Sequence, residues 1–323
     1  MTIAGQHTQS FHPFFDPLID GRQLSWGKKV SIAVALGAAY LLLQYYSLPD
    51  KMDFFTHYCW ILGAIISTAV LALYISAEIF RRTLVTIYQL ESGAATCESI
   101  IHDWLSNRCY LIAGFSFAAT NTTVGHVLGV PAEFYATPFA LGSIYIGMFA
   151  AGFAAGMGSL GIIAIILLYL RFAPNLLHTL DPLSPDGTGG IKKLGDTLWF
   201  FGALSGLVGV LVSIYMFRVQ WTNMHSDIVK MVFLFWISLP YLFAVSIVLI
   251  PGLAVRRHVS YYKRYKVRQL KREKAKLYSA YKKFDAMEDD ALISEKKALK
   301  ERLIRIQDEL DRLKLMRNSH LDR

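Results

Sequence analysis

The sequence predicts an all-α integral membrane protein in which six transmembrane helices are followed by a cytoplasmic two-helix, coiled-coil hairpin tail. Of its 323 residues, 54% are hydrophobic and the mean hydropathy is +0.37, too apolar for an ordinary soluble domain. Six apolar runs of roughly 18 residues or more carry almost no charge. Residues 1–255 hold 12 Lys+Arg and 13 Asp+Glu, whereas residues 256–323 hold 21 and 11, so the net charge of +9 lies in the tail.

The apolar runs predict six membrane spans between an N-terminal segment, 1–29, and the tail, 256–323. Helices are expected because lipid cannot hydrogen-bond an open backbone, and the runs lack the alternation of a barrel strand. The fourth run is about 32 residues, or roughly 48 Å of helix, so we expect it to tilt, protrude or break near Gly156–Gly161. The spans are expected at about 30–48, 54–80, 110–130, 140–171, 198–217 and 231–255.

Lys and Arg gather in alternate loops, which predicts that both termini are cytoplasmic. One set of segments holds Lys28, Lys29 and the basic tail, whereas the opposite set holds only Lys51, Arg218 and Lys230. Cytoplasmic loops of membrane proteins carry such an excess of basic residues. We therefore expect a bacterial inner membrane protein whose first span is an uncleaved signal anchor, because no cleavage site follows an apolar core in residues 1–29.

The tail predicts two helices joined by a charged break at Met287–Asp290. Apolar residues recur at spacings of three and four in both halves, from Val267 to Phe284 and from Leu292 to Leu313. This is a heptad seam. It favours an antiparallel hairpin, and a continuous helix in a parallel oligomeric coiled coil is the alternative. A homo-oligomer or a helical protein partner of the tail is expected in either case.

The first tail helix, 256–284, carries 12 Lys+Arg against one acid, Glu273, with tyrosines interleaved. Next to a membrane, basic residues are drawn to anionic lipid. Basic and aromatic residues together also occur in nucleic-acid-binding proteins, but the juxtamembrane position favours lipid over nucleic acid. The residues predicted to contact lipid are Arg256, Arg257, Lys263, Arg264, Lys266 and Arg268.

A glycine-rich cytoplasmic loop before the fifth span is a candidate ligand or ion site. Glycines allow backbone N–H groups to turn toward an anion, and the next span offers a helix N-terminus. The spacing fits neither a P-loop nor a Ca²⁺ loop, so a tight turn is the alternative reading. A similar Asp-Pro-Leu pattern at Asp16 raises the hypothesis of an internal repeat. The candidate residues are Asp181, Asp186, Gly187, Gly189, Gly190, Lys192 and Lys193.

Asn121, Thr122 and His126 form a candidate intramembrane polar site in the third span. Polar groups are costly in lipid, so they are expected to face protein or a water-filled path. Glycines crowd the fourth and fifth spans, where small residues allow helices to approach closely. Packing explains both features, and a channel or transporter built from these spans is the alternative.

Catalytic, metal and cofactor sites are not predicted. The sequence has no nucleophile elbow, and its cysteines, Cys59, Cys97 and Cys109, lack metal-ligand spacing. We therefore expect a non-enzymatic membrane scaffold, sensor or effector that acts through its cytoplasmic tail and loops. The alternatives are the ion channel or transporter and a membrane enzyme using the Asp181–Lys193 loop.

Overall fold

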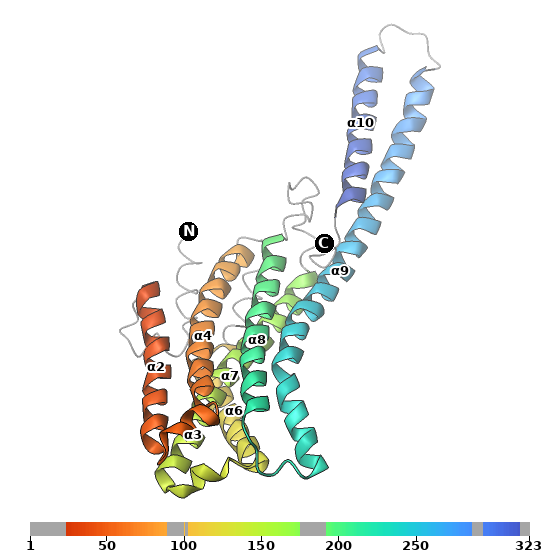
Figure 1. The fold of residues 1–323 in the computed structure, drawn as a ribbon. Coiled ribbons are helices and arrows are strands. Elements are labelled where there is room, and N and C mark those ends of the chain that lie inside the picture. The colour runs from red at the N-terminus through yellow and green to blue at the C-terminus, as the bar shows by residue number, and fades with distance from the viewer. Residues whose placement is uncertain (1–23, 89–99, 101–102, 175–191, 286–292, 317–323) are drawn as a thin grey trace. The chain divides into compact units, whose positions relative to one another are not determined.

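The computed structural model describes residues 24–88, 100, 103–174, 192–285 and 293–316, and every regular element among these residues is a helix. The chain consists of two units: a bundle unit, Met1–Leu168 with Thr197–Leu249, and a hairpin unit, Tyr169–Asp196 with Ile250–Arg323. Figure 1 shows the elements in order: α2 (Trp26–Ser47), α3 (Lys51–Thr56), α4 (Cys59–Tyr88), α6 (Asn107–Leu128), the 3₁₀ helix η2 (Ala132–Ala136), α7 (Pro138–Phe172), α8 (Lys192–Arg218), α9 (Asp227–Asp285) and α10 (Ile293–Leu315).

Five helices among the described residues are long and apolar enough to cross a membrane: α2, α4, α7, α8 and α9. The all-helical class is therefore confirmed for the described residues, and the five apolar helices are consistent with a membrane protein. Helix α6, which covers the predicted third span, is not among the five. Its polar residues, from Thr120 to Thr123, lower its mean hydropathy, although at 22 residues it is as long as α2.

The predicted start of the second span, at Phe54, is wrong. Asp50 caps α3 by accepting a hydrogen bond from the Met52 backbone N–H at 2.8 Å, so Phe54 belongs to this short helix. The chain then turns at Tyr58, whose φ of 54° lies in the left-handed region. The long helix begins only at Cys59. The turn was not predicted because the residues on both sides of it are apolar.

The predicted fourth span is one uninterrupted helix. Helix α7 runs for 35 residues from Pro138 to Phe172, so it does not break near Gly156–Gly161. Helix α9 is also continuous, over 59 residues, and passes through the predicted boundary at residues 255 and 256 without ending. The predicted end of the sixth span is therefore not a helix end.

The bundle unit packs around an apolar core contributed by every one of its long helices. Buried members include Tyr40, Ile65, Ile144 and Tyr215, all less than 10% exposed. At one end, the loop after α8 is tied to the loop after α6, because the backbone N–H groups of Thr222 and Asn223 donate to Gly129 O and Leu128 O, each at 3.0 Å. These bonds join segments far apart in the sequence.

In the hairpin unit, α10 lies antiparallel along the second half of α9 (Figure 1). The buried seam consists of Leu270 from α9 and Ile306, Leu310 and Leu313 from α10. Polar contacts follow the same register. Lys266 pairs with Glu309 at 3.8 Å, and Glu273 pairs with Arg302 at 3.7 Å. As the α9 number rises the α10 number falls, which is an antiparallel arrangement.

Candidate functional site

Asn121, which the sequence predicts to lie within the membrane, joins three helices of the bundle unit. From α6, its side-chain Nδ2 donates to Met148 O of α7 at 2.6 Å, and its Oδ1 accepts from Trp236 Nε1 of α9 at 2.9 Å. Both ends of the amide are therefore occupied by protein. An amide so satisfied holds helices together at little desolvation cost.

Thr122 and His126 do not converge with Asn121 on one site. The Thr122 hydroxyl donates to Ala118 O within α6, at 2.9 Å. His126 Nδ1 lies 2.9 Å from the Tyr145 hydroxyl of α7. His126 follows Asn121 by five positions, which places the two residues about 140° apart around the helix. The three residues predicted as one site thus have three separate environments.

The glycines of α7 and α8 form close helix contacts. A Cβ on Gly152 would lie 2.8 Å from Asn121 Cβ, and one on Gly156 would lie 2.4 Å from Ala113 O of α6. In α8, a Cβ on Gly202 would lie 2.8 Å from Val248 of α9. These faces are filled by neighbouring helices, which agrees with the packing interpretation. Gly206 is different, with no atom within 4 Å.

A second polar group, not predicted as a site, joins α2 to α7. The Ser47 and Ser143 hydroxyls lie 2.8 Å apart, and Ser47 also donates to Gln44 O. Gln44 itself is fully buried, and neither polar atom of its side chain has a hydrogen-bond partner. The only sequence signal for this polar group is a single glutamine, Gln44, in an apolar run. That signal does not indicate which helix the group contacts.

The predicted loop site is mostly outside the described residues, which exclude Asp181, Asp186, Gly187, Gly189 and Gly190, as well as the Asp16 segment. Lys192 and Lys193 form the first turn of α8, and the Lys192 side chain is exposed. Within the described part of the chain, no group of three or more His, Cys, Asp or Glu is placed to hold a metal ion.

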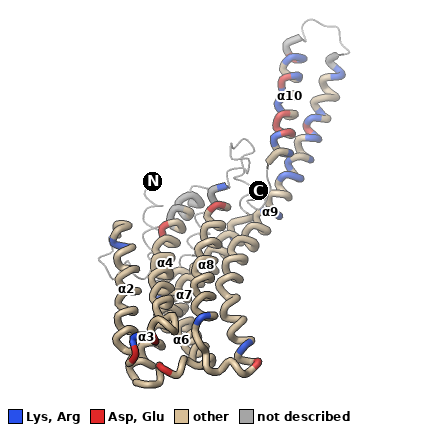
Figure 2. The backbone as a smooth tube through the Cα atoms, viewed as in Figure 1, with Lys and Arg blue, Asp and Glu red and all other residues tan. Residues whose placement is uncertain are grey.

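In the hairpin unit, the six basic residues predicted to contact lipid fall into two groups, one partly buried and one exposed. Lys263 donates to Met316 O, directly after α10, and Lys266 is paired with Glu309 of α10, so both side chains are partly buried. The other four, Arg256, Arg257, Arg264 and Arg268, are exposed. Figure 2 shows that Lys and Arg are dense along both helices of this unit.

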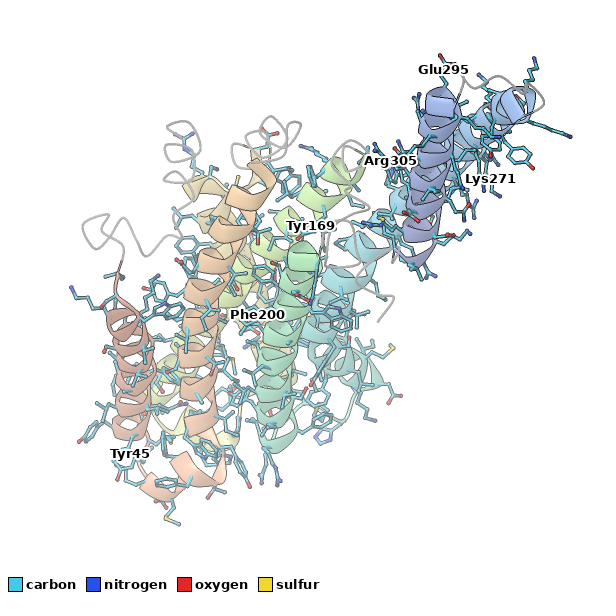
Figure 3. All side chains as sticks on the ribbon, turned by 90° about the horizontal axis from the view of Figure 1, so that it is seen from above. Tyr45, Tyr169, Phe200, Lys271, Glu295 and Arg305 are labelled. Atoms are coloured by element: carbon cyan, nitrogen blue, oxygen red, sulfur yellow. The ribbon has the colours of Figure 1, made fainter. Side chains whose placement is uncertain are left out.

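An exposed row runs along α9 on the face away from α10, and we call it the basic stripe: Arg257, Tyr261, Arg264, Arg268 and Lys271. Intervals of three, four or seven residues keep successive members on one side of a helix. Leu270, at the centre of the seam, lies about 140° around the helix from Arg257. Figure 3 shows Lys271 on this helix, with Arg305 and Glu295 on α10.

Asp311 of α10 bonds to two side chains of its own helix. Hydrogen bonds from Lys314 and then Gln307 hold the pKa of the Asp311 carboxyl below its usual value. This contribution to stability is present at neutral pH and is lost as the pH falls through the lowered pKa.

Tyr261, Tyr265 and Tyr278 of α9 are between 60% and 64% exposed, so these three aromatic rings are available to a partner.

Comparison with known proteins yields no match among protein-family models, curated proteins or solved structures. The geometry of the two units is therefore the basis for the function proposed below.

Proposed function

We propose that this chain is a six-span, non-enzymatic membrane scaffold or sensor that acts by binding anionic lipid through the basic stripe of its cytoplasmic hairpin. The proposal rests on the observation that two faces of α9 make different contacts. The seam and the ion pairs to α10 use one face of the helix, and the stripe occupies another. The stripe is thus a separate surface whose arginines are exposed.

The chemistry of the stripe suits lipid phosphates. Guanidinium groups form paired hydrogen bonds with phosphate oxygens, and tyrosine rings favour the boundary between headgroups and hydrocarbon. Arg257 and Tyr261 lie within about 9 Å, along the helix, of the predicted end of the sixth span. Each basic residue near an anionic surface contributes about 1 kcal/mol of binding free energy.

The six-span arrangement is also part of the proposal, with α6 as the third span. Its 22 residues extend about 33 Å, enough to cross a hydrocarbon core of roughly 30 Å. The side chain of Asn121, well inside the helix, is satisfied by α7 and α9 rather than by lipid. Six spans keep the basic tail on the same side as the N-terminus, as the distribution of Lys and Arg requires.

The test uses the full chain in nanodiscs, with a spin label on a cysteine at Tyr265, next to the stripe, and the native cysteines replaced by serine. Lipid contact is read from the accessibility of the label to a headgroup-bound nickel relaxer. We expect accessibility to rise when phosphatidylglycerol replaces part of the phosphatidylcholine, and to fall again in high salt.

Two variants make the test specific. Changing Arg257, Arg264, Arg268 and Lys271 to Gln is expected to abolish the response. Changing Lys282, Lys283, Lys297 and Lys300 to Gln removes the same charge, but Lys282 lies about 40 Å along α9 from Val255, so the response is expected to remain. Equal loss in both variants would contradict a role for the stripe, and an unchanged response in both would exclude the charge mechanism.

A further inference from the structure

The bundle unit contains an apolar cavity of about 190 Å³ lined by α4, α6, α7, α8 and α9. Its walls are built largely of alanine, glycine and aliphatic residues, and none of the described residues that line it is charged. A dry cavity of about 150 Å³ is large enough to bind benzene. This cavity therefore has room for a hydrocarbon ligand.

Three of the polar side chains at the cavity already form hydrogen bonds with protein groups. Ser159 donates to Ala155 O at 2.8 Å, Ser205 donates to Pro240 O at 3.0 Å, and Asn121 is bonded to Trp236. A buried water needs two to four polar partners. Because these groups already bond to protein, the cavity favours an apolar occupant over water or an ion.

The shape of the cavity favours a chain over a compact ring. Its lining residues on α7 extend from Ala151 to Ile165, about 21 Å along the helix axis, and those on α4 extend from Ile65 to Phe80 over a similar length. A volume of about 190 Å³ spread over that length is narrow. The cavity is also only partly enclosed.

We propose that this cavity binds one acyl chain of a membrane phospholipid. An unfilled cavity forfeits the dispersion contacts of its walls, whereas an acyl chain in the surrounding bilayer loses no hydrophobic free energy by entering. The site is separate from the basic stripe and does not depend on the function proposed for it. It requires only that the bundle unit lie in a bilayer.

The test uses the full chain in liposomes that contain phosphatidylglycerol with a diazirine midway along one acyl chain. After irradiation, the labelled residues are mapped by mass spectrometry. We expect label on Ala155 and Ser159, which line the cavity, in addition to the lipid-exposed Leu207. Label on Leu207 but none in the cavity would overturn the proposal. A free fatty acid with the same diazirine is the second probe, and cavity label from it alone would overturn the assignment to a phospholipid.

A matched pair of glycine variants tests whether the label reports the cavity. Gly158 lines it, and a Cβ there would meet only Leu73 at 3.7 Å, so Gly158→Leu is expected to fill the space and remove the cavity label. Gly206 is equally open but does not line the cavity, so Gly206→Leu is expected to keep it. Persistence of the label in Gly158→Leu would contradict binding inside the cavity.

A second filling variant and a water probe complete the design. Ser76→Leu fills the cavity from α4, so it is expected to remove the label even if Gly158→Leu does not fold. Ser159→Cys, with the native cysteines replaced, is expected to resist a charged, water-soluble thiol reagent. Rapid modification of that cysteine would show a water-filled cavity and overturn the proposal.

Discussion

At the scale of single residues, Asn121 connects three helices of the bundle unit. Its two hydrogen bonds link α6 to α7 and to α9. Hydrogen bonds between membrane helices contribute about 0.6 kcal/mol on average and up to about 1.7 kcal/mol. We expect Asn121→Ala to lower the free energy of unfolding by about 1–2 kcal/mol, measured by thermal or detergent-induced unfolding of the purified chain.

Two further variants separate the Asn121 bonds from general effects. Trp236→Phe removes only the bond to Oδ1, so a smaller loss is expected, and the double variant should be less destabilised than the sum of the two single ones. Thr123→Ala is the control, because Thr123 is exposed and bonds only to Ala119 O in its own helix. A loss as large in Thr123→Ala would refute the interhelical explanation.

The sequence identified polar residues that must avoid lipid, but not their partners. Asn121, Thr122 and His126 are close in sequence, yet they meet different groups because helical rotation separates them. The partners of Asn121, Met148 O and Trp236 Nε1, belong to distant helices. No single-sequence pattern encodes such pairings, since they depend on how the helices pack.

At the scale of the elements, the glycines of α7 differ in what surrounds them. A Cβ on Gly156 would lie 2.4 Å from a backbone oxygen of α6, whereas Gly142 has no atom within 4 Å. We expect Gly156→Ala to destabilise the chain by about 1–3 kcal/mol. Gly142→Ala is expected to be neutral or to stabilise it by up to about 1 kcal/mol through helix propensity. Equal unfolding transitions for the two variants would disprove the close contact.

Helices with long apolar runs were predictable, and their ends were not. The apolar runs coincide with α2, α4, α7, α8 and the first part of α9. The sequence did not reveal that Asp50 caps a separate short helix or that the chain turns at Tyr58, because Phe54 and Phe55 before the turn and Cys59 and Trp60 after it make the stretch largely apolar. Nor did it reveal that α9 continues past residue 255, since charge changes there while helix propensity does not.

At the scale of the whole molecule, the topology is testable with two exposed positions. Met52 is 66% exposed and follows the first span, and Leu315 is 83% exposed near the end of α10. With the native cysteines replaced, we expect Met52→Cys to react with a membrane-impermeant maleimide in intact cells. Leu315→Cys is expected to react only after permeabilisation.

Each outcome of the labelling experiment bears on the number of spans. If Leu315→Cys reacted in intact cells and Met52→Cys reacted only after permeabilisation, the orientation predicted from Lys and Arg would be reversed. Reaction of both cysteines in intact cells would require an even number of crossings between them, and α6 would then not be a span. The distribution of charge that predicted the topology is a property of the whole chain, which explains why it could be read without any knowledge of the helix contacts.

The backbone bonds from Thr222 and Asn223 to Gly129 and Leu128 have a consequence for the order of folding. Contacts between segments distant in the chain form late, because the intervening loop must first be closed. Gly129 O and Leu128 O can therefore accept these hydrogen bonds only after the loop that follows α8 has been synthesised and lies on the same side of the membrane as the loop after α6. This tie therefore forms only after α6, α7 and α8 have been made, and it cannot nucleate the bundle unit.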